Sequence, residues 1–112
     1  MSKAAVALSK RVDSRILLLR GQKIILDSDL AELYGVPSKR LNQQVTRNAR
    51  RFPTDFRFRL LRSEHDNLRL QIATSSLKHG GRRYLPYAFT EHGAIMAATV
   101  LNSKRAIQRA SL

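Results

Sequence analysis

The stretch DSDLAELYGVPSKRLNQQVTRNARR, residues 27–51, decides the fold that this chain is expected to adopt. It predicts a short helix, a tight turn and a second, longer helix. Asp27 or Ser28 is expected to cap the first helix, because their side-chain oxygens accept hydrogen bonds from free N–H groups at a helix start. Gly35 is expected to end that helix in the left-handed conformation, which glycine adopts without steric cost. Pro37 suits the opening of the second helix, since its fixed φ fits there and its missing N–H is not needed.

The second helix, expected over residues 38–51, has an apolar and a polar face. Its apolar residues recur at spacings of three and four, and they are Leu41, Val45, Ala49 and Phe52. The polar face holds side chains that pair bidentately with base edges, Asn or Gln with adenine and Arg or Lys with guanine. Two interpretations fit: a DNA-binding helix-turn-helix, and an ordinary helical hairpin with a solvated outer face. On the first, the expected base-reading residues are Lys39, Asn42, Gln43, Thr46 and Arg47.

Charge is the strongest global signal in the 112 residues, which suit one domain of ordinary size. The formal net charge is +13, and 15 of the 21 basic residues are arginine, which favours polyanionic partners: nucleic acid or an anionic membrane surface. Residues 37–83 hold most of the excess, with twelve basic side chains against three acidic ones. The expected phosphate contacts come from Ser38, Arg40, Arg50, Arg51, Arg57, Arg59, Lys78, Arg82 and Arg83.

The segments around the central stretch predict strands and helices of an α+β domain. Residues 16–19 and 23–26 flank Gly21-Gln22, which predicts a β-hairpin, although the first run also fits a helical turn. Residues 56–60 alternate apolar and basic side chains, as expected for a half-buried strand with its arginines on the open face. Residues 84–89 predict a strand that pairs with it, and Pro86 favours an edge position for that strand.

Two further helices are expected in the C-terminal half. Ser63 with Asp66 starts a capping pattern for a short helix that includes Leu68, Leu70, Ile72 and Ala73. Thr90 is expected to cap a helix over residues 91–101. The side chains expected to pack inward from that helix are Ile95, Met96, Thr99 and Val100.

Several function classes lack their usual sequence signals. There is no cysteine, and the histidines at 65, 79 and 92 do not have metal-ligand spacing. The eight acidic residues are scattered, which disfavours a Mg²⁺-dependent phosphodiesterase. The longest apolar stretch, residues 94–101, is far below bilayer-spanning length. We therefore expect a cytoplasmic protein that is not an enzyme and uses no cofactor and no metal. The aromatic residues could stack on single strands, but their alternation favours core packing, and they are Phe56, Phe58, Tyr84 and Tyr87.

Six motifs, in one order along most of the chain, carry a family resemblance. They are RGQK at 20–23, LDSDLAELYGV at 26–36, FPTDF at 52–56, QIATS at 71–75, LPYAFTE at 85–91 and LNSKRAI at 101–107. The run from about residue 12 to 107 resembles the KilA-N-type DNA-binding domain, in the branch found at the N-terminus of phage open-reading-frame-six proteins. The resemblance implies a DNA-binding module of phage and prophage proteins, often attached to a second domain and linked to antirepressor-like regulation. Members generally continue the last helix with apolar residues, so this chain is expected to be a truncated member or an isolated domain.

The sequence thus predicts one small α+β domain with an N-terminal β-hairpin, a helix-turn-helix, and then strand, helix, strand and helix with a wing-like hairpin. Residues 1–13 are expected to be a flexible basic tail, residues 14–107 the domain and residues 108–112 a shortened helix or tail. The predicted function is sequence-reading binding of double-stranded DNA in a phage or prophage regulatory protein, with no membrane partner. The alternative is an antirepressor-like module that binds an acidic repressor through the same basic face.

Overall fold

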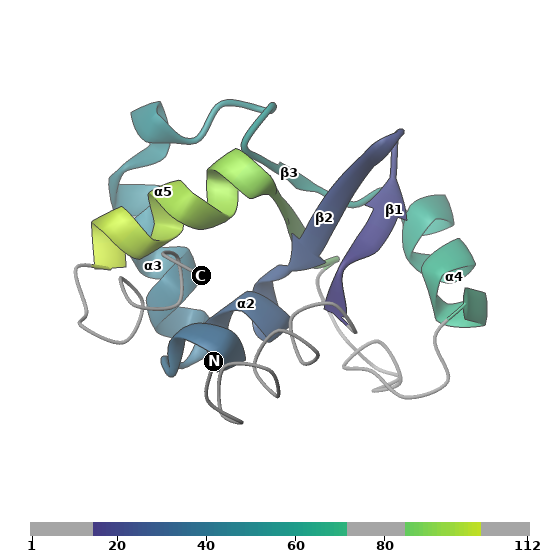
Figure 1. Cartoon of the computed structure of the whole chain (residues 1–112), viewed down its shortest axis with the longest axis horizontal. Coiled ribbons are helices and arrows are strands. Elements are labelled where there is room, and N and C mark those ends of the chain that lie inside the picture. Colours follow the sequence, from purple (N-terminus) through teal and green to yellow (C-terminus); the bar gives the residue numbers. More distant parts are fainter. Residues whose placement is uncertain (1–14, 72–84, 102–112) are drawn as a thin grey trace, which may run out of the picture.

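The computed structural model describes residues 15–71 and 85–101, and it confirms the expected α+β domain (Figure 1). A four-stranded antiparallel sheet in the order β1-β2-β4-β3 separates helices α2, α3 and α5 from helix α4. The elements, in chain order, are β1 (Leu17–Leu19), β2 (Gln22–Leu26), α2 (Asp27–Tyr34), α3 (Ser38–Arg47), the 3₁₀ turn η1 (Ala49–Arg51), β3 (Arg57–Arg59), α4 (Arg62–Gln71), β4 (Tyr87–Thr90) and α5 (Glu91–Leu101).

The N-terminal hairpin forms as expected, but its turn lies one residue earlier. Leu19 pairs with Gln22, so Arg20 and Gly21 are the two turn residues, with φ of 54° and 75°. The predicted Gly21-Gln22 turn was therefore wrong. Hairpin turns of the mirror-image type I′ need positive φ at both central residues. The Arg20 side chain donates two hydrogen bonds to Glu64, of 2.8 and 3.0 Å, and its guanidinium carbon lies 4.0 Å from the centroid of the Phe58 ring.

Strand β4 lies in the middle of the sheet, and it pairs with β2 on one side and β3 on the other. The predicted pairing with residues 56–60 is confirmed, whereas the edge position inferred from Pro86 was wrong. Pro86 immediately precedes the strand, where its missing N–H removes no bond from the ladder. Its carbonyl still accepts a hydrogen bond from Leu60 N at 3.0 Å.

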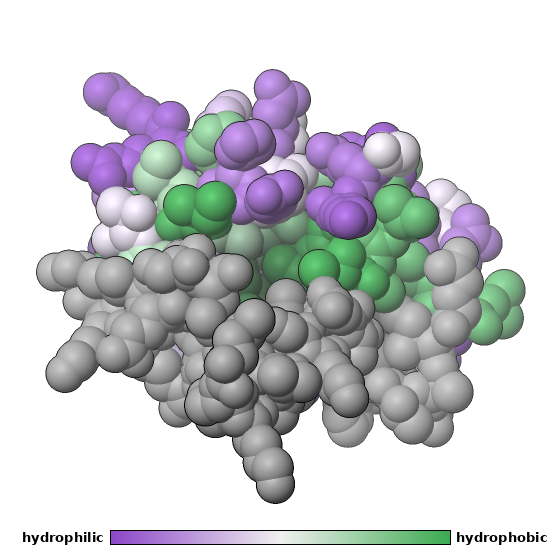
Figure 2. All heavy atoms as spheres, in the orientation of Figure 1, coloured by the Kyte–Doolittle hydropathy of each residue, from purple (hydrophilic) through white to green (hydrophobic). Residues whose placement is uncertain are grey.

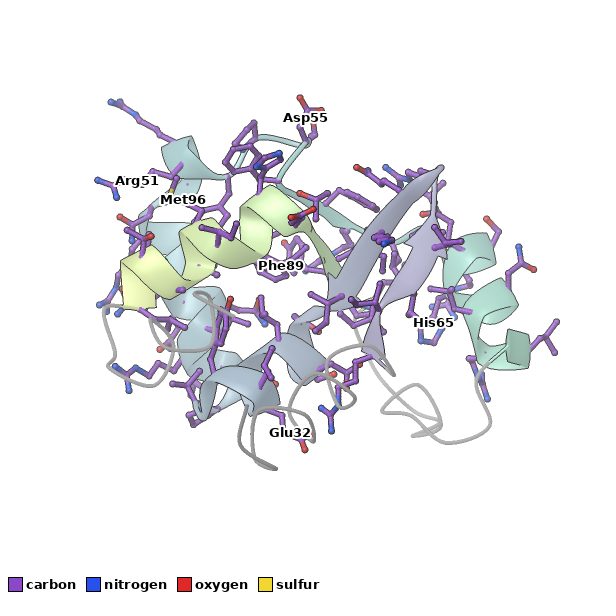
Figure 3. All side chains as sticks on the ribbon, in the orientation of Figure 1. Glu32, Arg51, Asp55, His65, Phe89 and Met96 are labelled. Carbon is purple, nitrogen blue, oxygen red and sulfur yellow. The ribbon has the colours of Figure 1, made fainter. Side chains whose placement is uncertain are left out.

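The sheet buries a different hydrophobic cluster on each face. Ile25 and Phe89 are paired neighbours on the face covered by α2, α3 and α5, and Figure 3 shows Phe89 between the sheet and α5. The opposite face packs Phe58 and Ala88 against Leu68 of α4. Successive strand residues point to opposite faces, so both clusters follow from the alternation along β2, β3 and β4.

The first turn of α4 differs from the sequence prediction. The predicted Ser63–Asp66 capping pattern was wrong, because the helix begins at Arg62 and Glu64 Oε1 accepts a hydrogen bond from Leu61 N at 2.8 Å. Leu68 is buried in this helix and Leu70 is exposed. Ile72 and Ala73 lie outside the described residues.

Helix α5 begins as predicted but buries a different face. Thr90 Oγ1 accepts a hydrogen bond from Gly93 N at 3.3 Å, which confirms Thr90 as the cap. The inward positions of Ile95 and Thr99 were wrong, because both are exposed; Met96 and Val100 are half-buried against the core. The fully buried residues are the small Gly93, Ala97 and Ala98, together with Leu101. Among the described helices, none is long and apolar enough to span a bilayer.

Candidate nucleic-acid interface

The turn between α2 and α3 has the geometry that its sequence predicts. Gly35 is left-handed, with φ 71° and ψ 31°, and Val36 N donates to Ala31 O at 3.0 Å. Pro37 occupies the position just before α3, and its carbonyl accepts a hydrogen bond from Leu41 N at 3.1 Å. The expected cap of α2 is confirmed in part: the helix begins at Asp27, directly after Leu26, and Asp27 Oδ1 accepts a hydrogen bond from Ser28 N at 2.8 Å. These contacts fix the angle at which α3 leaves α2.

Helix α3 ends earlier than its periodicity predicts. It stops at Arg47, because Asn48 leaves the helical conformation and its amide donates to Gln44 O at 2.8 Å. Leu41 and Val45 are fully buried as predicted, whereas Ala49 is exposed on η1 and breaks the expected apolar face. The single helix expected over 38–51 is therefore a helix followed by a 3₁₀ turn.

The five predicted base-reading residues all line one groove of about 750 Å³. Four of them, on the exposed face of α3, are Lys39, Gln43, Thr46 and Arg47. Asn42 is the half-buried fifth. Arg59 of β3 lines the same groove, together with the segment Leu85, Pro86 and Tyr87 that leads into β4. The fold thus brings the polar face of α3 opposite a wall made by residues distant in the sequence.

Asp27 lines the same groove but is almost entirely buried, with 5% of its surface exposed. Its Oδ2 accepts hydrogen bonds from Asn42 Nδ2 at 3.2 Å and from Tyr87 N at 3.4 Å, while its Oδ1 accepts one from Ser28 N at 2.8 Å. The carboxylate therefore ties α3 to the first residue of β4. Sequence reasoning missed this role, because a helix-start aspartate gives no local signal of a partner in a later element.

Two arginines of β3 hold the aromatic ring of Tyr87. The Arg57 and Arg59 guanidinium carbons lie 4.0 and 4.5 Å from the ring centroid, as cation–π contacts require. Phe58 is buried and Arg59 is exposed, as the alternating pattern predicts, but Arg57 is half-buried. Burial lowers the pKa of Arg57, and the charge of Arg59 acts in the same direction, whereas Tyr87 and Asp27 raise it.

The remaining predicted phosphate contacts lie outside the groove. Arg40 is exposed on α3, and Ser38 is half-buried at the first position of that helix. Arg50 and Arg51 are exposed on η1, and Figure 3 shows Arg51 at the outer edge of the domain. Figure 2 shows hydrophilic side chains gathered along the upper edge of the view, over η1 and the tip of the β1–β2 hairpin. Lys78, Arg82 and Arg83 fall outside the described residues.

The structure describes two of the three histidines, His65 and His92. His65 is buried in α4, and the His92 ring stacks on Phe56 with centroids 5.8 Å apart. Within residues 15–71 and 85–101, no three His, Asp or Glu side chains are grouped to hold a metal ion. The arrangement offers cations, amides and a hydroxyl along one groove, which is chemistry for binding.

Comparison with protein families identifies the residues that this chain shares with a known domain. The family model of the ORF6N domain matches residues 14–100, a range that includes the β1–β2 hairpin, the α2–α3 turn and every residue that lines the groove. No curated protein and no solved structure matches the chain.

Proposed function

The chain belongs to the phage-associated ORF6N domain family, and from this membership we propose that it is a sequence-reading, double-stranded DNA-binding module of KilA-N type in a phage or prophage regulatory protein. One observation carries the proposal. The residue types that pair with base edges lie together on the exposed face of α3, directly after a helix-turn-helix turn, along a single groove.

Helix α3 has the position and side chains of a reading element. Lys39, Gln43 and Arg47 are four residues apart, so they follow one face of the helix. The DNA major groove is about 12 Å wide and admits one α-helix. Within it, the amide of Gln43 can bond adenine, and the cations of Lys39 and Arg47 can bond guanine.

Cations on three elements supply attraction that does not depend on sequence. Arg40 lies on α3, Arg50 and Arg51 lie on η1, and Arg59 lies on the opposite wall of the groove. Phosphate contacts of this kind position a protein on the duplex, and base contacts then specify the site. We therefore assign Arg50 and Arg51 to phosphate binding and the α3 face to reading.

The test compares one reading residue with one phosphate contact on two duplexes. A duplex selected from a random pool and a scrambled duplex are titrated against each variant. Gln43→Ala should cost about 1–3 kcal/mol on the selected duplex and almost nothing on the scrambled one. The control, Arg50→Ala, should weaken both to a similar degree and lower the salt slope by about one.

Two results would contradict the proposal. If Gln43→Ala leaves the ratio of the two affinities unchanged, α3 is not the reading element. If the wild-type protein selects no duplex at all, DNA is not the ligand, and the alternative partner for the same basic face is an acidic repressor. A complex with such a repressor should then resist competition by duplex DNA.

A further inference from the structure

Asn42, like Gln43, has a side chain suited to read adenine, but its amide is held by Asp27. Asn42 Nδ2 donates to Asp27 Oδ2 at 3.2 Å, and both residues line the groove. Asn42 Oδ1 is buried, and no hydrogen bond from the described residues reaches it. In this conformation Oδ1 is buried and one Nδ2 donor is used by Asp27, so the amide cannot present its acceptor and donor together to a base.

Arg57 has buried donors without hydrogen bonds to any described residue, and it lies against Tyr87, whose backbone N–H donates to the same carboxylate. Its Nε and Nη1 are buried and make no hydrogen bond within the part of the chain that the structure describes. Its guanidinium lies over the Tyr87 ring, while the backbone N–H of Tyr87 donates to Asp27 Oδ2. Burial lowers the pKa of Arg57, while the charge of Asp27 acts in the opposite direction and favours the charged guanidinium.

These unsatisfied groups can satisfy one another by exchanging partners. A buried acceptor or donor without a hydrogen bond costs free energy, and Asn42 contributes one such acceptor and Arg57 two such donors. If Asn42 leaves Asp27, its Oδ1 and Nδ2 become available to a base edge. Arg57 can then donate to the vacated position on Asp27, as a charge-assisted hydrogen bond that is stronger than the amide bond it replaces.

We infer that Asp27 and Arg57 control base recognition by Asn42. In the free protein Asp27 holds the Asn42 amide against the groove wall, and on specific DNA Arg57 takes over the carboxylate while Asn42 turns to an adenine. Adenine is the base because its N7 acceptor and N6 donor match the two polar atoms of an asparagine amide. Arg57 is thus a positioning residue that acts through Asn42. This inference rests on the proposed function.

The first experiment follows the side-chain amides of the wild-type protein by NMR during titration with its selected duplex. Asn48 is the internal control, since its amide donates to Gln44 O at 2.8 Å, outside the groove lining. The Asn42 amide resonances should shift strongly at saturation, while those of Asn48 stay nearly constant. If the Asn42 amide resonances stay constant as well, the amide has not left Asp27 and the inference is overturned.

The second experiment replaces each adenine of the selected duplex, one at a time, by 7-deazaadenine, which lacks the N7 acceptor. One position should weaken wild-type binding by about tenfold to a hundredfold, the range expected for one bidentate base contact. That loss should vanish in Asn42→Ala and shrink in Arg57→Gln. The matched control, Arg59→Gln, removes the exposed arginine from the same Tyr87 ring, so it should weaken all duplexes and keep the full discrimination.

The outcomes separate this inference from the function it rests on. If the loss of affinity caused by 7-deazaadenine persists in Asn42→Ala, the contact to that adenine is made by another residue. This result overturns the inference but leaves sequence-specific binding intact. Equal discrimination in Arg57→Gln and wild type overturns the role of Arg57. Wild-type protein that binds no duplex overturns both. If Asn42→Ala does not fold, the NMR titration still decides the question, because it uses only the wild-type protein.

Discussion

At Gly93 the backbone of α5 passes so close to the turn before β3 that any side chain would overlap the Phe56 carbonyl. That carbonyl cannot move easily, because it accepts a hydrogen bond from Thr90 N at 3.0 Å. We expect Gly93→Ala to lower the free energy of unfolding by about 3 kcal/mol, the upper part of the range for overpacked cores.

The matched control for this substitution is Gly21→Ala. Unlike Gly93, Gly21 has an unfavourable backbone for alanine, with φ +75°, but its Cβ would meet nothing within 4 Å. It should cost only about 1 kcal/mol, which is the backbone term alone. Denaturant unfolding of the two variants measures the difference. If the two variants lose the same free energy of unfolding, the backbone at Phe56 can move away from α5, and the contact does not restrict that helix.

Tyr34 links α2 to α5 through a hydrogen bond that requires its phenol to be protonated. Its hydroxyl donates to Ala94 O at 2.7 Å, and burial raises its pKa from 10.0 to about 12. Because the pKa of Tyr34 is raised in the folded state, the stabilisation that its protonated side chain provides is complete below pH 10.0. It is lost as the pH rises toward about 12. At neutral pH, Tyr34→Phe should therefore cost about 0.5–1.5 kcal/mol, the net value of one hydrogen bond.

Unfolding curves of wild type and Tyr34→Phe at neutral and alkaline pH test this link. The stability gap between them should narrow above pH 10.0, because only the wild type must keep the Tyr34 phenol protonated. Ultraviolet absorbance of the folded wild type should show a tyrosine that ionises near pH 12, and this step should be missing in Tyr34→Phe. A gap that stays constant with pH would mean that the phenol is not buried between these helices.

Element boundaries show where periodicity succeeds and where it fails. The turn at Gly35 and the buried pair Leu41 and Val45 could be predicted, because local backbone preference and helical spacing determine both. The end of α3 could not, because the Asn48 side chain competes for a backbone carbonyl of the helix. The buried face of α5 was mispredicted because hydrophobicity favours Ile95, whereas the close approach at Gly93 selects small residues.

Across the whole molecule, four exposed cations on α3, η1 and β3 that are assigned to phosphate set the expected salt dependence. They are Arg40, Arg50, Arg51 and Arg59. If each neutralises one phosphate, log K should fall with log salt at a slope of about −4, from about −0.9 per contact. The affinity should then drop roughly a hundredfold between about 50 and 200 mM salt. Fluorescence anisotropy across this range measures the slope, and binding indifferent to salt would exclude a phosphate-dominated interface.

One wall of the groove could be predicted from the sequence, and the other could not. Charge, residue type and helical spacing are enough to identify the polar face of α3, because all three are local properties of the sequence. The opposite wall could not be anticipated, because Tyr87 reaches Asp27 only through the pairing of β4 with both β2 and β3. The same long-range contact changes how Asn42 is interpreted, since a residue chosen for its exposed polar face is half-buried and bonded to a carboxylate.

The central place of β4 has a consequence for how the protein is made. The strands on either side of it, β2 and β3, are synthesised first and have no direct partner in each other. On the ribosome, helices α2 and α3 therefore emerge before the sheet on which they pack is complete, and pairing over long sequence separations is slow to form. A nascent chain that ends before residue 87 exposes two unpaired strand edges, which are prone to aggregate. This topology makes synthesis of β4, rather than synthesis of α3, the event that permits the sheet to form.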